Sequence, residues 1–222
     1  MRNIVKTTLS EQIYSILRED IINQTIKCGE KLTLKMLQER FNLSSTPIRE
    51  ALGRLSLDGL IDHVTNVGGR VVDLGAKDIE EIYDFCAVLD ISAMRFSLQG
   101  KDCEQVKAEL KRNIISQEKA LEKGNMKEFM AYSDDFHDIF FKYADNSRLY
   151  EASLKVRSQF SILATRYQNY TVAKSIVFIE HQSIAENIIN YDFENAYILM
   201  ERHFEHAKNY LIENITNSAQ LT

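Results

Sequence analysis

Apolar residues recur at every fourth position from Leu9 to Ile21 and predict an amphipathic helix over about Leu9–Asn23. A second, short helix is predicted from Leu34 to Phe41. A third begins at Thr46-Pro47, where Thr46 can cap it and proline suits the first helical position. Asp58-Gly59 ends this helix, because glycine readily takes the left-handed conformation after a helix.

Two short segments after the third helix have the pattern of strands. Residues 60–64 and 70–74 are rich in β-branched and aliphatic side chains, and residues 65–69 form the hairpin tip between them. Three helices, a tight turn at residues 42–45 and a two-stranded wing make a winged helix. Its last helix usually enters the DNA major groove. A winged helix that makes only protein contacts is the alternative.

The rest of the chain has the composition of helices. Six of the eight glycines and the single proline lie in residues 1–75. A long stretch with so few helix breakers is typical of an all-helical domain. We therefore predict a mainly α fold, with a winged-helix domain over 1–75 and a helical bundle over 76–222. Six amphipathic segments are expected in the bundle, at about 78–99, 102–123, 126–145, 147–169, 172–190 and 193–215.

Composition narrows the class of protein. The net charge of −5 excludes a strongly basic chain that coats nucleic acid by charge alone. No run of 18 apolar residues is present, and the N-terminal residues lack the apolar stretch of a signal peptide, so we expect a cytoplasmic protein with no membrane partner. The three cysteines fit neither a disulfide framework nor a zinc finger.

The outward strip of the third helix is small or cationic, with Arg49, Gly53 and Ser56 opposite its apolar face. Lys35, Arg49, Arg54 and Arg70 can share one surface, where contacts to phosphates position the protein and contacts to bases specify the sequence. For Arg54, a solvated charge is the favoured interpretation.

The segment from Ser44 to Leu55, S-S-T-P-I-R-E-A-L-G-R-L, followed by Asp58-Gly59-Leu60-Ile61, resembles the signature of GntR-family bacterial transcription regulators. The resemblance places Lys35, Thr46 and Arg49 in DNA-contact positions, and Gly69-Arg70 in the wing. It also places Ser45 where the family usually has an arginine. A base or phosphate contact is therefore lost or replaced, and the operator need not follow the commonest half-site.

Three histidines fall at one level of the expected bundle. His181 and His203 lie about equally far from the turn at 191–192, so they lie at the same height in the bundle. Counted through the turn at 146, the height of His137 differs from that of His181 by about four residues, or ~6 Å along the axis. Three imidazoles at one level would make a metal site. From spacing alone, the alternative is that these are ordinary core or surface histidines without a common ligand. His206 follows His203 by three and is the less favoured ligand.

Phe136-His137, Glu180-His181 and the segment from Ala196 to His203-Phe204 resemble the histidine motifs of the FCD ligand-binding domain of FadR-type GntR regulators. The resemblance implies one divalent cation, zinc or nickel, with an organic acid effector beside it.

Two positions depart from the FCD pattern. The usual carboxylate ligand position is Ser133, so Asp134 is a doubtful substitute or water fills the position. Cys86 stands where many members carry an arginine that pairs with an effector carboxylate.

These features predict a transcription regulator that is not an enzyme. Its partners would be operator DNA and a small-molecule effector, for which a carboxylate is a candidate. We expect a homodimer, because one winged helix buries too little surface for selective binding and two-fold proteins read two-fold sites. Two alternatives stay open: a metal-dependent enzyme built on the bundle, and a DNA binder whose metal is purely structural.

Overall fold

The computed structural model describes residues 7–65, 67–168 and 171–219. The chain divides into two compact units, Met1–Gly75 with Leu154–Ile162, and Ala76–Ser153 with Leu163–Thr222. Each is described here by itself. Among the described residues, no helix is both long and apolar enough to cross a membrane.

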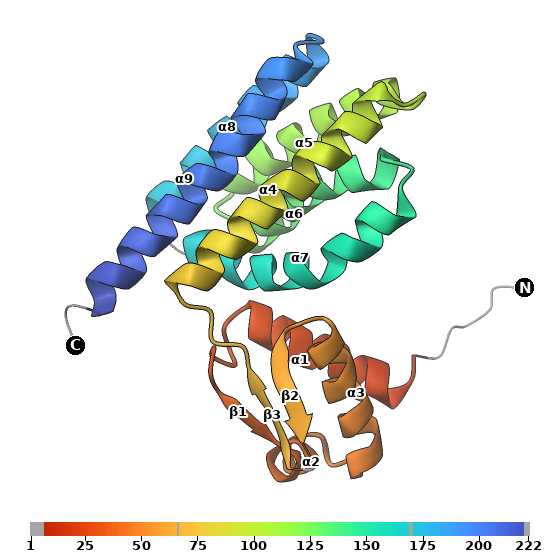
Figure 1. The fold of residues 1–222 in the computed structure, drawn as a ribbon, viewed down its shortest axis with the longest axis vertical. Helices are drawn as coiled ribbons and strands as arrows, with labels where there is room; N and C mark the ends of the chain where they lie inside the picture. The colour runs from red at the N-terminus through yellow and green to blue at the C-terminus, as the bar shows by residue number, and fades with distance from the viewer. Residues whose placement is uncertain (1–6, 66, 169–170, 220–222) are drawn as a thin grey trace, which may run out of the picture. The chain divides into compact units, whose positions relative to one another are not determined.

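The first unit contains a winged helix (Figure 1). Its elements are α1 (Leu9–Ile22), β1 (Lys31–Thr33), α2 (Leu34–Phe41), α3 (Ser45–Leu57), β2 (Ile61–Thr65) and β3 (Gly68–Val71). The strands form one antiparallel sheet in the order β1-β3-β2. The predicted three helices and wing are confirmed.

Local sequence explains why α1 and α3 form and pack together. The Thr8 side chain accepts from the Glu11 backbone, and the Glu11 side chain accepts from the Thr8 backbone, which satisfies donors at the start of α1. Ile13, Leu17 and Ile21 of the α1 stripe are buried, whereas Leu9 is exposed, and α1 packs against α3. In α3, Ile48, Leu52 and Leu55 are fully buried. The opposite side of α3, which includes Thr46 and Arg49, is left exposed.

Two boundary predictions in this unit were wrong, and one strand was not predicted. The α3 helix begins at Ser45 with Ser44 as its N-cap, so Thr46 is not the cap and Pro47 is the third helical residue. Proline is tolerated there because the backbone N–H groups of the first turn lack partners within the helix. The third strand, β1, has only three residues, too few to show an alternating pattern. Finally, β3 ends at Val71 rather than residue 74.

Gly68 lets the wing approach β1. Its φ is +133°, and a Cβ atom there would lie 2.0 Å from the backbone oxygen of Leu32. Any other residue would therefore push the wing away from β1.

The second unit contains the helical bundle (Figure 1). Its helices are α4 (Ala76–Gln99), α5 (Cys103–Glu122), α6 (Met126–Tyr143), α7 (Ser147–Gln168), α8 (Thr171–Ile189) and α9 (Phe193–Ala219). The six predicted segments are confirmed, with ends shifted by a few residues. Helix α4 packs on α6 and α9, α5 packs on α6 and α8, and α8 packs on α9. These contacts bring α4, α5, α6, α8 and α9 around one level of the bundle interior.

Candidate functional site

The structure brings His137, His181 and His203 together in the interior of the bundle. They come from α6, α8 and α9, all three are buried, and one potential ligand atom from each lies within 4.8 Å of the others. The ring centroids are 4.7 to 5.4 Å apart. The levels inferred from the sequence therefore correspond to a spatial cluster.

Each imidazole is held at its Nδ1 atom by an oxygen from a side chain. His137 Nδ1 lies 2.6 Å from Asp90 Oδ1, and His203 Nδ1 lies 2.7 Å from Glu180 Oε2. His181 Nδ1 lies 3.1 Å from Gln117 Oε1. When Nδ1–H donates to such an oxygen, the neutral ring keeps its lone pair on Nε2. Carboxylate and carbonyl partners of this kind orient histidine ligands toward metals and make them more basic.

His181 provides the test of whether the cluster suits a metal. Its Nε2 atom is fully buried and has no hydrogen-bond partner among the described residues. A buried polar atom without a partner is costly, and a metal ion would relieve that cost. Nitrogens bound at about 2.0–2.1 Å to one tetrahedral ion lie about 3.4 Å apart. The three imidazoles, whose ligand atoms lie within 4.8 Å of one another, would therefore close by up to about 1.4 Å around a divalent cation. Three buried imidazoles suit such an ion chemically.

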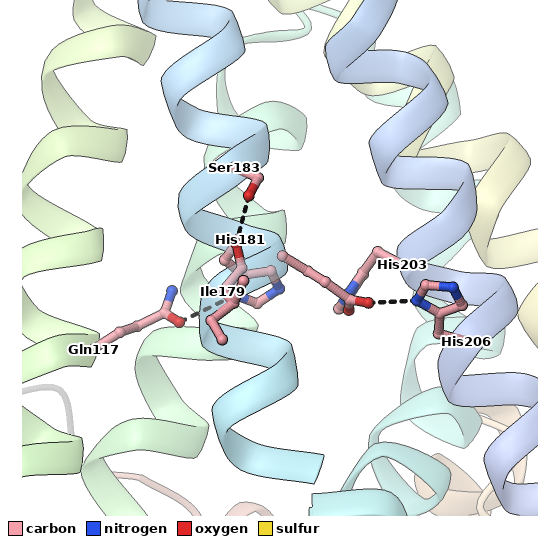
Figure 2. A network of polar contacts seen from close by, with 7 residues as sticks. Gln117, Ile179, His181, Ser183, His203 and His206 are labelled. Atoms are coloured by element: carbon pink, nitrogen blue, oxygen red, sulfur yellow. Dashed lines mark hydrogen bonds and ion pairs between the residues drawn. The ribbon is translucent and has the colours of Figure 1, made fainter. Parts of the chain in front are cut away.

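The Gln117 amide that holds His181 (Figure 2) is itself fixed by a second amide. Gln117 Nε2 donates to Asn113 Oδ1 at 2.6 Å, and Asn113 Nδ2 donates to the Tyr132 carbonyl at 2.9 Å. Gln117 and Asn113 are one turn apart on α5, and both are buried. This relay fixes which way the Gln117 amide points, so that its oxygen faces His181.

Glu180 binds a second histidine, and aromatic rings enclose the cluster. His206 on α9 lies 2.6 Å from Glu180 Oε1 but is exposed, so it sits at the outer end of the network (Figure 2). The Phe136 ring stacks on His181 with centroids 4.1 Å apart, and Phe204 packs against His137 and His203. An apolar wall of this kind limits water and strengthens electrostatic interactions within the site.

Burial favours the neutral form of the His181 and His203 imidazoles. It lowers the pKa of His181 well below the usual 6.5, and the charges of His203 and His137 lower it further. Burial also lowers the pKa of His203, although its hydrogen bond to Glu180 acts in the opposite direction. Burial would raise the pKa of Glu180, but its contacts with His203 and His206 outweigh that effect and lower it. At neutral pH, neutral His181 and His203 therefore lie beside an ionised Glu180.

These pKa shifts predict how the metal-free protein responds to acid. His181 and His203 have folded-state pKa values below the unfolded value of about 6.5, so below that pH the unfolded chain binds more protons. The free energy of unfolding should therefore fall as the pH drops from about 6.5. The slope can reach about 1.4 kcal/mol per pH unit for each histidine. Urea unfolding of chelator-treated protein between pH 7.5 and 5 measures it.

The matched control for this pH prediction is His181→Gln, which removes one of the two titrating groups. Its free energy of unfolding should depend less on pH than that of the wild type over the same range. Equal slopes for the two proteins would contradict the assignment of a lowered pKa to His181.

Asp134 and Ser133, the residues predicted at the fourth ligand position, are placed differently. Asp134 is exposed on α6 and does not belong to the cluster, while Ser133, at the family's usual ligand position, is buried. Besides Glu180, the carboxylate that reaches the cluster is Asp90 on α4, one turn after the buried Cys86. The sequence could have indicated a buried role for Asp90, because it lies among the buried apolar residues of α4, next to Leu89.

The sequence of α5 also contains an indication, weaker than that for Asp90, of side chains that face the histidine cluster. Asn113 and Gln117 continue the buried stripe of Val106 and Leu110, so polar side chains occupy places where the pattern expects apolar ones. Buried amides need partners, and these two lead to His181.

The residues proposed for DNA contact lie on α2, α3 and the wing. Lys35 on α2 is exposed, as are Thr46 and Arg49 at the start of α3. Ser45 is half-buried at the first position of α3. In β3, Gly69 is half-buried, and the exposed Arg70 donates through Nη1 to the carbonyl of Gly29.

Arg54 is exposed on α3, and its side chain contacts a residue of α1. Its guanidinium lies 4.3 Å from the centre of the Tyr14 ring on α1, where a cation–π contact holds it.

Comparison with known families decides the assignment. The family described as "Bacterial regulatory proteins, gntR family" matches residues 9–71, and the FCD domain matches residues 81–206, more than half of the chain. The chain belongs to the GntR family and carries an FCD domain. The predicted family and two-part fold are therefore confirmed, and the regulator is a DNA-binding transcription factor.

Relatives of this regulator cover most of its length. An uncharacterized HTH-type transcriptional regulator, YdhC of Bacillus subtilis, is 29% identical over 88% of this chain and 87% of its own. The HTH-type transcriptional repressor GlaR of Escherichia coli is 26% identical over 86% of this chain and 90% of its own. These relatives are transcription regulators, so the regulator is not an enzyme, and the enzyme alternative is excluded.

Solved structures agree on the fold. A putative GntR regulator from Rhodococcus superposes with a TM-score of 0.77, at 18% identity, over 93% of this chain and 99% of that one. Escherichia coli McbR/YncC gives a TM-score of 0.76, at 18% identity, over 94% and 99%. At this level of identity the likeness establishes the fold alone.

Proposed function

We propose that this protein is a metal-dependent, ligand-responsive transcription regulator in which residues 1–75 bind operator DNA and residues 76–222 sense and dimerise. The observation that carries the proposal is the cluster of His137, His181 and His203, each oriented at Nδ1, with a buried Nε2 of His181 that lacks a partner. Three imidazole ligands suit zinc or nickel. Operator binding also implies a location in the bacterial cytoplasm, where the chromosome lies.

The three histidines would hold the metal, and a carboxylate effector would bind at the positions that they leave open. The metal supplies the positive charge for that effector, and Cys86 stands where an arginine would otherwise pair with it. Asp90, Gln117 and Glu180 fix the imidazole rings from α4, α5 and α8. A ligand at this centre therefore bears on several helices at once. It changes operator affinity only if it binds one arrangement of those helices better than another.

The DNA-binding half of the proposal rests on the exposed start of α3. Thr46 and Arg49 would approach base edges, Lys35 and Arg70 would approach phosphates, and Ser45 and Gly69 would lie at the backbone of the operator. Ser45 offers one hydroxyl where an arginine would offer a charged fork, so its contact is weaker and less directional.

The experiment that tests effector sensing measures operator affinity in four states. Chelator-treated and zinc-loaded protein are each titrated with operator, with and without a panel of small carboxylic acids. One acid should change the affinity of the zinc-loaded protein at least about 5-fold, and it should have no effect after chelation. An equal response with and without metal would contradict metal-dependent sensing, and no response to metal or acid would favour a purely structural metal.

We also predict that the protein protects an inverted repeat. Two half-sites should be centred about 34–36 Å apart, or a multiple of that spacing, because each protomer of a two-fold dimer presents one α3 to the major groove. Footprinting of DNA upstream of candidate target genes measures the protected pattern. Protection of a single half-site by a monomer would contradict this prediction.

A further inference from the structure

The outer face of α4 is apolar at its centre. Val88 is 61% exposed, and Phe85 and Phe96 are each 47% exposed, while Ile91 is half-buried. The opposite face of α4 already supplies the core of the bundle. A surface helix normally covers its outer side with charged residues. An apolar outer side on such a helix marks a contact surface.

A shallow groove follows this face between α4 and α9. Its volume is about 310 Å³. Ala87, Val88 and Ile91 on α4 and Phe204 on α9 supply its apolar part, and Glu201, Glu205 and Lys208 on α9 supply charged walls. Ile198 of α9 is also exposed, at 47%. A groove of this size and lining accepts aliphatic side chains of another helix.

The charges on this face complement each other when the helix is reversed. Asp84 and Arg95 are the exposed charged residues between positions 84 and 96 of α4, and they lie about three helical turns apart on one side. A two-fold axis between Leu89 and Asp90 would place Asp84 opposite the partner's Arg95. It would also place Val88 opposite the partner's Ile91. A self-complementary arrangement is what an isologous interface requires.

Within its own chain, each of these charges already has a contact and stays accessible. Asp84 Oδ1 lies 2.5 Å from Lys208 Nζ, and the Asp84 side chain is 64% exposed. The Arg95 guanidinium lies 4.9 Å from the centre of the Tyr197 ring, and Arg95 is exposed. Both can therefore take a second partner from another molecule.

We infer that two copies of the chain pair through α4, antiparallel across a two-fold axis. Reciprocal contacts between Asp84 and the partner's Arg95 flank a centre formed by Val88 and Ile91 of both copies. The inference rests on the homodimer of the proposed function, and it assigns the face by which the dimer forms. The occupant of the apolar groove is thus a second copy of this chain.

The experiment uses two opposite charge variants of the full-length protein. Asp84→Arg puts two cations on the face, and Arg95→Asp puts two anions there. In a homodimer of either variant, residue 84 of each copy faces residue 95 of the other copy with the same charge. This repulsion occurs at both ends of the interface, so the dimer dissociation constant should rise about 100-fold or more. When the two variants are mixed in equal amounts, every meeting pair is opposite in charge. A heterodimer should form, measurable by sedimentation velocity and native mass spectrometry.

Controls separate this interface from general effects of charge or misfolding. Glu118→Arg, at an exposed position on α5, should stay dimeric. Arg95→Asp leaves the contact between Asp84 and Lys208 unchanged, and circular dichroism should show an intact helical content for every variant. Val88→Asp should also be monomeric, because it buries a charge at the centre of the interface.

Each outcome decides a distinct point. Monomeric single variants that form a heterodimer on mixing support the inference. Variants that stay dimeric overturn the interface but leave the homodimer standing. Monomeric variants that fail to pair on mixing overturn the antiparallel arrangement and favour a different occupant of the groove. A monomeric wild type overturns the dimer itself and the interface with it.

Discussion

Zinc is expected to raise the melting temperature of the wild-type protein by about 5–10 °C, and His181→Gln is expected to abolish this rise. A ligand at 100 times its dissociation constant stabilises the folded state by about 2.7 kcal/mol. For a protein of this size each kcal/mol corresponds to about 2–4 °C. His181 supplies the buried Nε2 atom that otherwise lacks a partner, so its loss should affect metal binding most. A thermal melt with and without zinc, after removal of metals, measures the difference.

The control for the zinc effect is His206→Gln. His206 shares Glu180 with His203 but is exposed and lies outside the cluster of three histidines. This variant should keep most of the zinc-dependent rise. Comparing the rise within each variant removes the direct cost of each substitution to stability. A rise of equal size in the wild type and His181→Gln would contradict a site built on His181.

Arg49→Ala is expected to weaken operator binding by about 5- to 150-fold, which corresponds to the ~1–3 kcal/mol of a lost bidentate base contact. Arg49 is exposed at the start of α3, and the buried side of the same helix, including Ile48 and Leu52, is untouched by the change. The variant should therefore keep its helical content and its metal binding. Fluorescence anisotropy with a labelled operator at physiological salt measures the loss.

Arg112→Ala is the matched control, because it removes the same charge from an exposed position on α5. Its operator affinity should stay within about twofold of the wild type, since a distant charge adds little at physiological ionic strength. An Arg49→Ala variant that binds as tightly as the wild type would mean that α3 does not read the operator through this residue.

The sequence predicted the histidine cluster better than its surroundings, for a physical reason. The level of a residue along a helix follows from its distance to a turn, at 1.5 Å per residue, so His137, His181 and His203 could be aligned by counting. Which side chains face them depends on how each helix is rotated against its neighbours, and counting does not give that rotation. Asp90 and Gln117 were therefore missed, and Asp134 was considered although it is exposed.

Helix boundaries show a similar limit. The apolar stripe of α3 could be read from its spacing, but its start could not, because Ser44, Ser45 and Thr46 are all plausible caps. The strand β1 exists only because β3 pairs with it, at a point where Gly68 permits close approach. Such pairing between segments far apart in the sequence leaves little trace in either segment alone.

The most direct test of the central claim is a metal titration of the full-length protein, purified without a metal-affinity column and treated with a chelator. Wild-type protein should bind one equivalent of zinc or nickel per chain, and His137→Ala, His181→Gln and His203→Ala should each lose this binding. A wild-type protein that takes up no stoichiometric metal, or variants that bind it as the wild type does, would contradict the account.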